Sequence, residues 1–300
     1  MSQPRHLIST ADLSKQEVDD LVHRIKALAE FPAKNSLPRS VEDRRVGFLF
    51  YGKRSRRTFD SFVMAVQDLG WQYAGGMGAE DFSGMVGGES LEHAAYFYGS
   101  RCSAIVIRHP KGDAQKTASK YSAVPILSAG GSKEGEHPTQ ALGDFVLLRS
   151  LLGGCGGKEV AFVGNLLDSS SVHSLCYLLR HELPKRVYVV SPEGQGLPAE
   201  YKAVLSDVVE EGSVAHLPKS VKAIYLVQSP MAEDAKKYQV SRDVLTYLGN
   251  VLVLHPLPAG PELSKDVAND ARVVVRSQME YAHFARMACL DFLIGARTFK

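Results

Sequence analysis

The segment Val46-Gly47-Phe48-Leu49-Phe50 is followed almost at once by Gly52-Lys53-Arg54-Ser55-Arg56-Arg57-Thr58, and this order indicates the fold class. The first stretch is continuously apolar, as a strand that is buried on both faces requires. The second is a basic turn, and a helix is predicted after it because apolar residues recur at helical spacing at Phe62, Val63, Val66 and Leu69. A buried strand, a turn and a helix form the repeating unit of a parallel α/β sheet.

The same alternation continues over the whole chain. A capping-box pattern, Ser14 with Glu17, precedes the first predicted helix, and proline at a first helical position predicts another helix from His137-Pro138. Further buried strands are predicted at 104–107, 124–127, 160–163, 187–190, 223–227, 251–254 and 273–275. We therefore predict an α/β protein with two domains, each a mainly parallel sheet flanked by helices.

A glycine-rich stretch, Gly153-Gly154-Cys155-Gly156-Gly157, is the clearest break in the pattern. The strand pattern restarts after it, so we expect a change of domain near residues 140 to 155. We assign residues 1–142 to the first domain and residues 143–284 to the second. The C-terminal helix, residues 285–300, is predicted to return to the first domain.

The composition excludes several classes of protein. The chain has 300 residues, 45% of them hydrophobic and 23% charged, which is typical of globular proteins rather than disordered ones. A net charge of +2 gives no reason to expect a nucleic-acid partner. No apolar run approaches the ~20 residues of a membrane span, and the N-terminus lacks the apolar region of a signal peptide. We expect a cytoplasmic protein with no membrane partner.

The four cysteines support this expectation. Cys102, Cys155, Cys176 and Cys289 show no CxxC spacing and no metal-ligand pattern, and each lies in or beside an apolar stretch. We predict free core thiols, which fit a reducing compartment, and no metal site.

The basic turn has the residue types of an anion site. A helix N-terminus offers unpaired backbone N–H groups, Ser55 and Thr58 add hydroxyl donors, and Arg57 adds a guanidinium that matches a phosphate edge. A solvated basic turn is the alternative that the residue types leave open.

Three further motifs follow predicted strands or begin a helix. Arg108 follows a strand, where ligands of open α/β sheets gather, and His137 with Gln140 share one face of a helix start. The loop His255-Pro256-Leu257-Pro258 is stiffened by prolines, so its carbonyl groups can accept bonds from an amide. Taken singly, each has an ordinary structural explanation: a surface arginine, a helix cap, a rigid turn.

Together and in this order, the four motifs resemble those of the aspartate/ornithine carbamoyltransferase family. Ser55-Arg56-Arg57-Thr58 is similar to its Ser-x-Arg-Thr phosphate loop, and Arg108-His109-Pro110 to its Arg-His-Pro. His137-Pro138-Thr139-Gln140 and His255-Pro256-Leu257-Pro258 match its His-Pro-Thr-Gln and His-Pro-Leu-Pro, the latter in the form of the aspartate branch. The resemblance extends from about Arg5 to Leu293 and implies a carbamoyl-phosphate-binding first domain and an amino-acid-binding second domain.

The resemblance also implies roles for individual residues. The enzyme would be a transferase that uses carbamoyl phosphate, with no cofactor, and a homotrimer with active sites shared between subunits. The implied catalytic residues are Arg57, Thr58, Arg108 and His137. The implied carbamoyl-phosphate-binding residues are Ser55, Arg56, Arg57, Thr58, Arg108, His137, Gln140, Leu257 and Pro258.

The amino-acid half departs from the family. Val86 and Gly87 stand where aspartate carbamoyltransferases carry loop lysines, although Ser83 matches the family's loop serine. Ser170, Gln228 and Ala259 stand where the family has arginines, two of which grip the aspartate carboxylates. Burying two carboxylates without such partners is costly.

We therefore expect an acceptor other than aspartate, such as a diamino acid or another small amine. The candidate acceptor-binding residues are Ser83, Asp168, Ser170, Gln228 and Ser229, and Asp168 with Glu233 would suit a cationic acceptor. Two alternatives remain open. One is an aspartate carbamoyltransferase that draws cations from elsewhere, with Lys53, Arg54, Arg56 and Lys133 as candidates. The other is a non-catalytic relative that binds carbamoyl phosphate or another protein.

Overall fold

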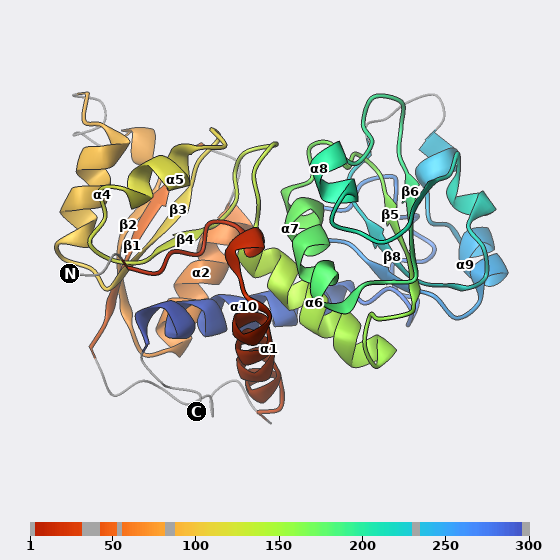
Figure 1. Ribbon diagram of the computed structural model, residues 1–300, viewed down its shortest axis with the longest axis horizontal. Coiled ribbons are helices and arrows are strands. Elements are labelled where there is room, and N and C mark those ends of the chain that lie inside the picture. The colour runs from red at the N-terminus through yellow and green to blue at the C-terminus, as the bar shows by residue number, and fades with distance from the viewer. Residues whose placement is uncertain (1–3, 32–42, 53–55, 82–87, 230–234, 296–300) are drawn as a thin grey trace. The chain divides into compact units, whose positions relative to one another are not determined.

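The computed structural model describes residues 4–31, 43–52, 56–81, 88–229 and 235–295. It divides into two compact units, Met1–Gly143 with Tyr281–Lys300, and Asp144–Glu280. The chain passes from one unit to the other within α6 (Pro138–Leu152) and returns within α10 (Val275–Ile294) (Figure 1). Each unit contains a parallel sheet flanked by helices, which confirms the predicted fold class.

The first unit is built on four parallel strands in the order β2-β1-β3-β4. The strands are β1 (Arg45–Phe50), β2 (Gln72–Met77), β3 (Ala104–Arg108) and β4 (Ile126–Ser128). The helices of this unit are α1 (Lys15–Ala29), α2 (Arg56–Asp68), α4 (Leu91–Gly99), α5 (Ala114–Ser119) and the second part of α10, with short 3-10 turns η1 (Thr10–Asp12) and η3 (Ala79–Asp81). The predicted capping box of Ser14 and Glu17 begins α1.

The side chains of alternate residues of β1 point to opposite faces of this sheet. Leu49 belongs to a buried cluster with residues of α4 and α5, whereas the rings of Phe48 and Phe50 pack edge-on against Phe59 and Phe62 of α2. Helices therefore cover both faces, as Figure 1 shows, with α4 and α5 on one side and α2 and α10 on the other. This explains why β1 is apolar at successive positions.

The second unit is built on five parallel strands in the order β7-β6-β5-β8-β9. The strands are β5 (Glu159–Val163), β6 (Arg186–Val190), β7 (Val208–Glu210), β8 (Val221–Leu226) and β9 (Leu252–Leu254). The helices are α7 (Ser170–Leu179), α8 (Ala199–Lys202) and α9 (Arg242–Leu248), with turns η4 (Arg180–Glu182), η5 (Val214–His216) and η6 (Ala235–Tyr238). Val244, Leu245 and Leu248 of α9 join the main buried cluster of this unit.

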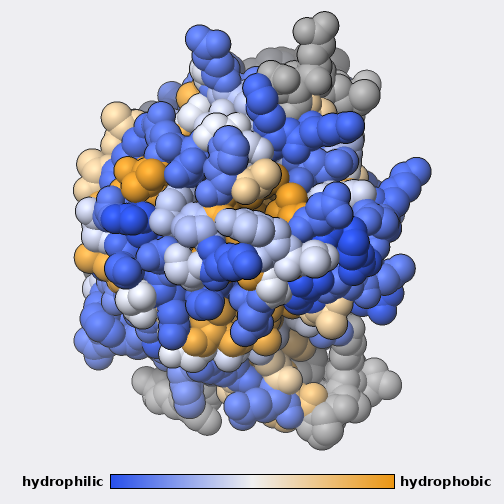
Figure 2. Space-filling view, turned by 90° about the vertical axis from the view of Figure 1, so that its right-hand side faces the viewer, coloured by the Kyte–Doolittle hydropathy of each residue, from blue (hydrophilic) through white to orange (hydrophobic). Residues whose placement is uncertain are grey.

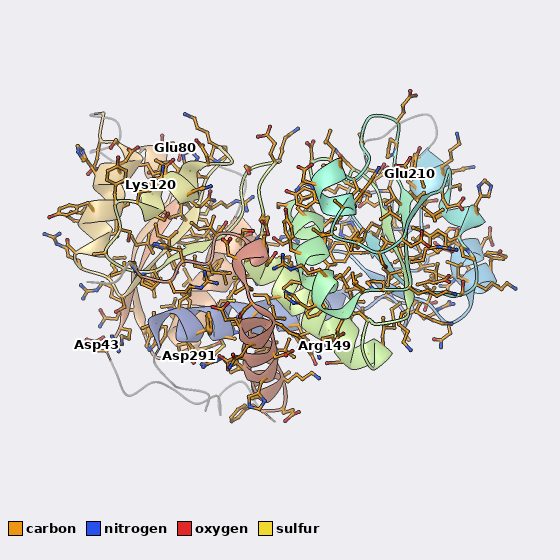
Figure 3. The ribbon with its side chains drawn as sticks, in the orientation of Figure 1. Asp43, Glu80, Lys120, Arg149, Glu210 and Asp291 are labelled. Carbon is orange, nitrogen blue, oxygen red and sulfur yellow. The ribbon has the colours of Figure 1, made fainter. Side chains whose placement is uncertain are left out.

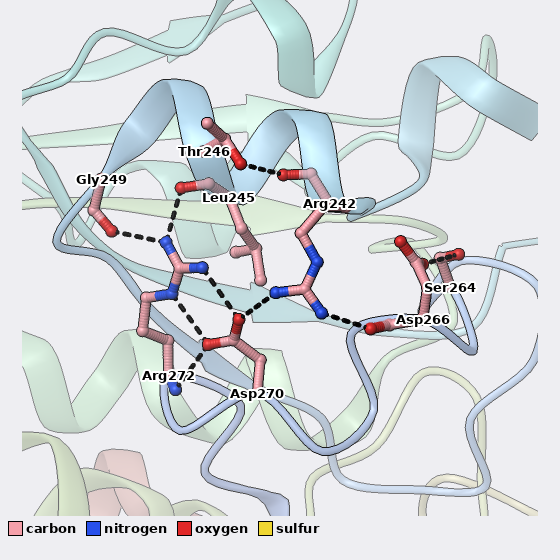
Figure 4. A network of polar contacts seen from close by, with 8 residues as sticks. All are labelled: Arg242, Leu245, Thr246, Gly249, Ser264, Asp266, Asp270 and Arg272. Atoms are coloured by element: carbon pink, nitrogen blue, oxygen red, sulfur yellow. Dashed lines mark hydrogen bonds and ion pairs between the residues drawn. The ribbon is translucent and has the colours of Figure 1, made fainter.

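A cluster of charged side chains closes the C-terminal end of α9 (Figure 4). Arg272 Nη1 donates to the carbonyl oxygens of Leu245 (2.6 Å) and Gly249 (2.8 Å), which lie at the end of the helix. Its Nε and Nη2 donate to the Asp270 carboxylate, each at 2.8 Å, and Arg242 Nη1 donates to the same carboxylate at 2.6 Å. Helix ends leave carbonyl groups unsatisfied, so this cluster supplies donors where they are needed.

The predicted strand at residues 273–275 is wrong. Val273 forms only an isolated bridge with Val253, and α10 already begins at Val275. The valines favour a strand by propensity, but the chain turns here around Asp270, which accepts from Arg272 N at 3.1 Å, while Val273 N donates to the Asp270 carbonyl at 2.9 Å.

Two edge strands, β2 and β7, give no apolar signal in the sequence. β2 contains Gly75 and Gly76 and is exposed along much of its length. Gly75 has φ +93°, and a Cβ there would lie 2.2 Å from the Phe48 carbonyl oxygen, so the close approach to β1 requires glycine.

The outer face of the second unit is mainly hydrophilic, with separated hydrophobic side chains, in the view of Figure 2. In the described part of the chain, no helix combines the length and the hydropathy that a membrane span needs.

Candidate functional site

The carboxyl ends of β1 and β3 lie side by side and bring two predicted motifs to one edge of the first sheet. Phe50 is paired with Arg108, and the backbone N–H of Tyr51 donates to the Arg108 carbonyl oxygen at 2.9 Å. The basic turn leaves β1 at this edge and enters α2 at Arg56. Ligands of parallel α/β sheets bind at such an edge.

Arg108 and His137 both lie close to Gly130, which is in the loop that follows β4. Arg108 Nη1 donates to the Ala129 carbonyl oxygen at 2.8 Å. A Cβ built on Gly130, which has φ +70°, would lie 2.9 Å from the His137 ring and 3.3 Å from Arg108 Nη1. The structure therefore brings these two predicted residues together, and the gap between them and the backbone admits only glycine.

Burial controls the charge of this pair. Burial lowers the pKa of Arg108, and burial together with Arg286 and Arg108 holds the pKa of His137 well below its usual range. Because a guanidinium pKa starts far above neutral pH, Arg108 stays cationic while His137 stays neutral. A cation and a neutral imidazole at one sheet edge are suited to a carbonyl oxygen that gains negative charge.

Glu136 anchors the start of α6, and sequence reasoning missed it. Its carboxylate accepts from the backbone N–H (2.9 Å) and the hydroxyl (2.8 Å) of Thr10, and also from the Ser9 hydroxyl. Its carbonyl oxygen accepts from the Ser128 hydroxyl at 3.4 Å. Its carboxylate partners, Ser9 and Thr10, are far away in the sequence, so its position beside His137 was the one available signal.

The described part of the basic turn gives its residues different environments. Arg56 Nε donates to both carboxylate oxygens of Asp60, at 2.8 and 2.7 Å, and its side chain is 78% exposed. Arg57 is exposed and Thr58 is half-buried, both in the first turn of α2. Lys53, Arg54 and Ser55 lie outside the described residues.

Glu80 is a second residue that sequence reasoning missed. The backbone N–H of Gly52 donates to both of its carboxylate oxygens, each at 3.1 Å, where the basic turn leaves β1. In Figure 3, Glu80 lies at the opposite end of the first unit from Asp43, which precedes β1. Nothing in the sequence around η3 marks Glu80 as part of this edge.

The second unit gathers polar side chains at the carboxyl ends of β5 and β8. The Asn165 backbone N–H donates to the Gln228 carbonyl oxygen at 3.1 Å, so the loops after the two strands are adjacent. Asp168 faces Asn165: the Asn165 side-chain amide donates to its carboxylate at 3.2 Å. The candidate acceptor residues Asp168 and Gln228 thus lie on neighbouring loops, whereas Ser83 and Glu233 fall outside the described residues, as do Val86 and Gly87.

Ser170 is the first residue of α7, at the same edge. The side chain of the N-cap residue Ser169 makes no capping bond and lies 3.4 Å from the Ser171 hydroxyl. A helix start presents backbone N–H groups and a positive dipole to an anion.

Gln228 reaches the His-Pro-Leu-Pro loop. Its side-chain amide donates to the Pro258 carbonyl oxygen at 3.1 Å. The structure therefore places Gln228, a candidate acceptor-binding residue, in contact with Pro258, a candidate carbamoyl-binding residue. No group of three or more His, Cys, Asp or Glu side chains within the described ranges is arranged to hold a metal ion.

Comparison with known families also divides the chain into two parts. Residues 5–150 match the model of the aspartate/ornithine carbamoyltransferase carbamoyl-P binding domain, and residues 156–293 match that of the Asp/Orn binding domain. The chain belongs to the aspartate/ornithine carbamoyltransferase family, and the predictions of family and of a carbamoyltransferase enzyme are confirmed.

Individual relatives span nearly the full chain. The aspartate carbamoyltransferase catalytic subunit of Clostridium novyi is 31% identical over 98% of this chain and 99% of its own. That of Methanospirillum hungatei is 32% identical over 88% and 91%. Among solved structures, the catalytic subunit of M. jannaschii aspartate transcarbamoylase has a TM-score of 0.87 at 29% identity, covering 98% of this chain and 99% of its own. The Trypanosoma cruzi aspartate transcarbamoylase in complex with carbamoyl phosphate and aspartate has a TM-score of 0.86 at 27% identity, covering 96% and 95%.

These relatives overturn the expectation of an acceptor other than aspartate. Aspartate carbamoyltransferases match along both domains, so the prediction of a diamino acid or another small amine as acceptor is wrong. The prediction depended on five positions: Val86, Gly87, Ser170, Gln228 and Ala259. It treated missing arginines as a missing carboxylate site, although backbone N–H groups, hydroxyls and amides also bind carboxylates.

Proposed function

We propose that this enzyme transfers the carbamoyl group of carbamoyl phosphate to the amino group of aspartate and releases phosphate. The observation that carries the proposal is the similarity to aspartate carbamoyltransferases along nearly the whole length of both chains. The Trypanosoma cruzi protein, solved with carbamoyl phosphate and aspartate, supports the same pair of substrates.

The proposed reaction needs charge stabilisation and placement rather than a covalent intermediate. The amine attacks the carbonyl carbon, a C–N bond forms, the C–O bond to phosphate breaks, and the departing phosphate can take the amine proton. Ser55, Arg56, Arg57 and Thr58 would bind the phosphate, with Arg108 and neutral His137 at the carbonyl oxygen. Negative charge develops on both groups, so fixed donors there lower the barrier.

The carbamoyl NH₂ group would bind to Gln140 and to the carbonyl oxygens of Leu257 and Pro258. We propose that the first unit is the carbamoyl-phosphate-binding domain and the second the amino-acid-binding domain, as the matching family descriptions suggest.

Aspartate would bind through neutral donors in the described part of the second unit. The start of α7, where Ser169 makes no capping bond, offers backbone N–H groups with the hydroxyls of Ser170 and Ser171. The Gln228 side-chain amide and Ser229 lie on the adjacent loop. Hydrogen bonds to a charged group contribute about 1.5–3 kcal/mol each, so several of them can replace arginine contacts. Asp168, which is bonded to Asn165, would then order this edge rather than meet a cation.

We also propose a homotrimer with shared active sites, as the match of Ser83 to the family's loop serine suggests, and a cytoplasmic location. The first rests on the resemblance to the family, and the relatives' name, catalytic subunit, fits a protein that works within an assembly. The second is supported by the four cysteines, which are buried and form no disulfide, because thiols persist in a reducing compartment.

Steady-state assays test the proposed acceptor. At saturating carbamoyl phosphate, aspartate is compared with ornithine, diaminopropionate, diaminobutyrate and simple amines, and carbamoylated product and phosphate are both measured. Aspartate is expected to give the highest kcat/KM. Faster turnover of any diamino acid, or phosphate release that no acceptor accelerates, would contradict the proposal.

A further inference from the structure

The loop between β9 and α10 is closed by two buried side chains, His255 and Glu262. His255 belongs to the His-Pro-Leu-Pro motif, but neither residue has so far been given a role in the reaction. His255 is the first residue after β9, and both side chains are 1% exposed. His255 Nε2 lies 2.8 Å from Glu262 Oε1. The two residues stand at the two ends of the segment that carries Leu257 and Pro258.

The hydrogen bonds of the ring fix its tautomer. The backbone N–H of Leu257 donates to His255 Nδ1 at 2.9 Å, so Nδ1 is the acceptor and the ring proton is on Nε2. Nε2–H therefore donates to the Glu262 carboxylate. Burial alone would raise the pKa of Glu262, but hydrogen bonds from His255 and from the Gly260 backbone outweigh it and lower that pKa. The pair is a neutral imidazole bonded to a carboxylate.

The pair holds the loop at two points. The ring binds the backbone of Leu257, and Glu262 Oε1 accepts from the Gly260 backbone N–H at 2.6 Å. A Cβ at Gly260 would lie 2.8 Å from Glu262 Oε2, so glycine is required for the carboxylate to reach its place. The His255 backbone N–H donates in turn to Gln278 Oε1 of α10 at 2.7 Å.

The backbone that these bonds hold has an unfavourable conformation at Leu257. Leu257 has φ +60°, a left-handed conformation that a leucine rarely adopts. Residues held in sparsely populated conformations persist only where their surroundings impose them, and they cluster at functional sites. Here the imposing contact is the bond from Leu257 N–H to His255.

We propose that His255 and Glu262 are positioning residues, which aim the carbonyl oxygens of Leu257 and Pro258 at the NH₂ group of carbamoyl phosphate. The inference rests on the proposed function for the identity of that ligand and for the assignment of these two carbonyl oxygens to it. Inorganic phosphate has no NH₂ group, so the pair should affect carbamoyl phosphate and not phosphate. A purely structural role would change both affinities or neither.

Calorimetry with carbamoyl phosphate and with inorganic phosphate tests this selectivity. Glu262→Ala is expected to weaken carbamoyl phosphate about tenfold, the effect of misplacing one or two hydrogen bonds, with phosphate affinity unchanged. Glu262→Gln keeps an oxygen for His255 and Gly260 and should restore most of the affinity. Glu159→Ala is the matched control, because Glu159 is also buried but lies at the amino end of β5, bonded to Ser220. It should change neither affinity.

His255→Gln provides a second route if Glu262→Ala does not fold. Its amide NH₂ can take the place of Nε2 as the donor to Glu262, but it then has no acceptor atom at the place of Nδ1 for Leu257 N–H, so the same selective loss is expected. Equal losses for both ligands, or unchanged carbamoyl phosphate affinity in a folded variant, would overturn the inference. Wild-type enzyme that binds carbamoyl phosphate without using aspartate would contradict only the proposed acceptor. Wild-type enzyme that does not bind carbamoyl phosphate would overturn both proposals.

Discussion

At the scale of single residues, Gly130 shapes the site because it has no side chain. Its place between Arg108 and His137 lets a cation and a neutral imidazole share one sheet edge. Both residues were recognisable in the sequence because each stands in a motif after a strand or at a helix start. Glu136 and Glu80 were not recognisable, because their partners Thr10 and Gly52 lie 126 and 28 positions away.

Arg57 is the residue on which the phosphate assignment can be checked most simply. Arg57→Ala should remove a charge-assisted contact that contributes roughly 1.5–3 kcal/mol, which weakens carbamoyl phosphate about 10- to 150-fold. Calorimetry measures the change. Arg101→Ala is the control, because Arg101 lies over the Phe97 ring, after α4 and before β3 begins. Unchanged affinity in Arg57→Ala, or an equal loss in the control, would reject the assignment.

At the scale of elements, the sequence predicted the central strands and the edge strands β4 and β9, but it missed the edge strands β2 and β7. β1, β3, β5, β6 and β8 all appear as apolar runs, because helices cover both of their faces. β2 at the edge tolerates polar residues and glycine, and so carries no such signal. Residues 273–275 show the reverse error, since β-branched propensity cannot reveal that no long partner strand is available.

The charged cluster at the end of α9 predicts a dependence of stability on pH. Bonds from the Arg272 side chain and backbone lower the pKa of Asp270 below its ordinary value. The unfolded chain then binds protons more readily, so this contribution to stability is complete above pH ~4 and is lost as pH falls further. Asp270→Asn should lower the Tm at pH 7 and reduce the additional loss of Tm in acid.

Thermal unfolding at pH 7 and at several values below pH 4 measures this effect. Asp207→Asn is the matched control, because Asp207 forms a more exposed pair with Arg186 in the same unit. Its effect should be small, as is usual for a surface ion pair. If the two variants follow the same curve, the cluster around Arg272 has no special role.

At the scale of the whole molecule, the proposed trimer is testable without any substrate. Light scattering at micromolar concentration should report a mass three times the 32.7 kDa of the chain, or a multiple of that mass. The sequence itself could not predict this assembly by any physical pattern; it came from the resemblance to the family. A monomer under these conditions would count against both the trimer and a site shared between subunits.

The central claim is that one chain recognises both carbamoyl phosphate and aspartate. Calorimetry with N-(phosphonacetyl)-L-aspartate, which unites the two substrates, and with phosphonoacetamide, which lacks the aspartate part, tests it most directly. Two bound carboxylates should add about 1.5 kcal/mol or more each, so the first compound is predicted to bind at least ~100-fold more tightly. Equal affinities would show that the second unit has no aspartate site and would contradict the account.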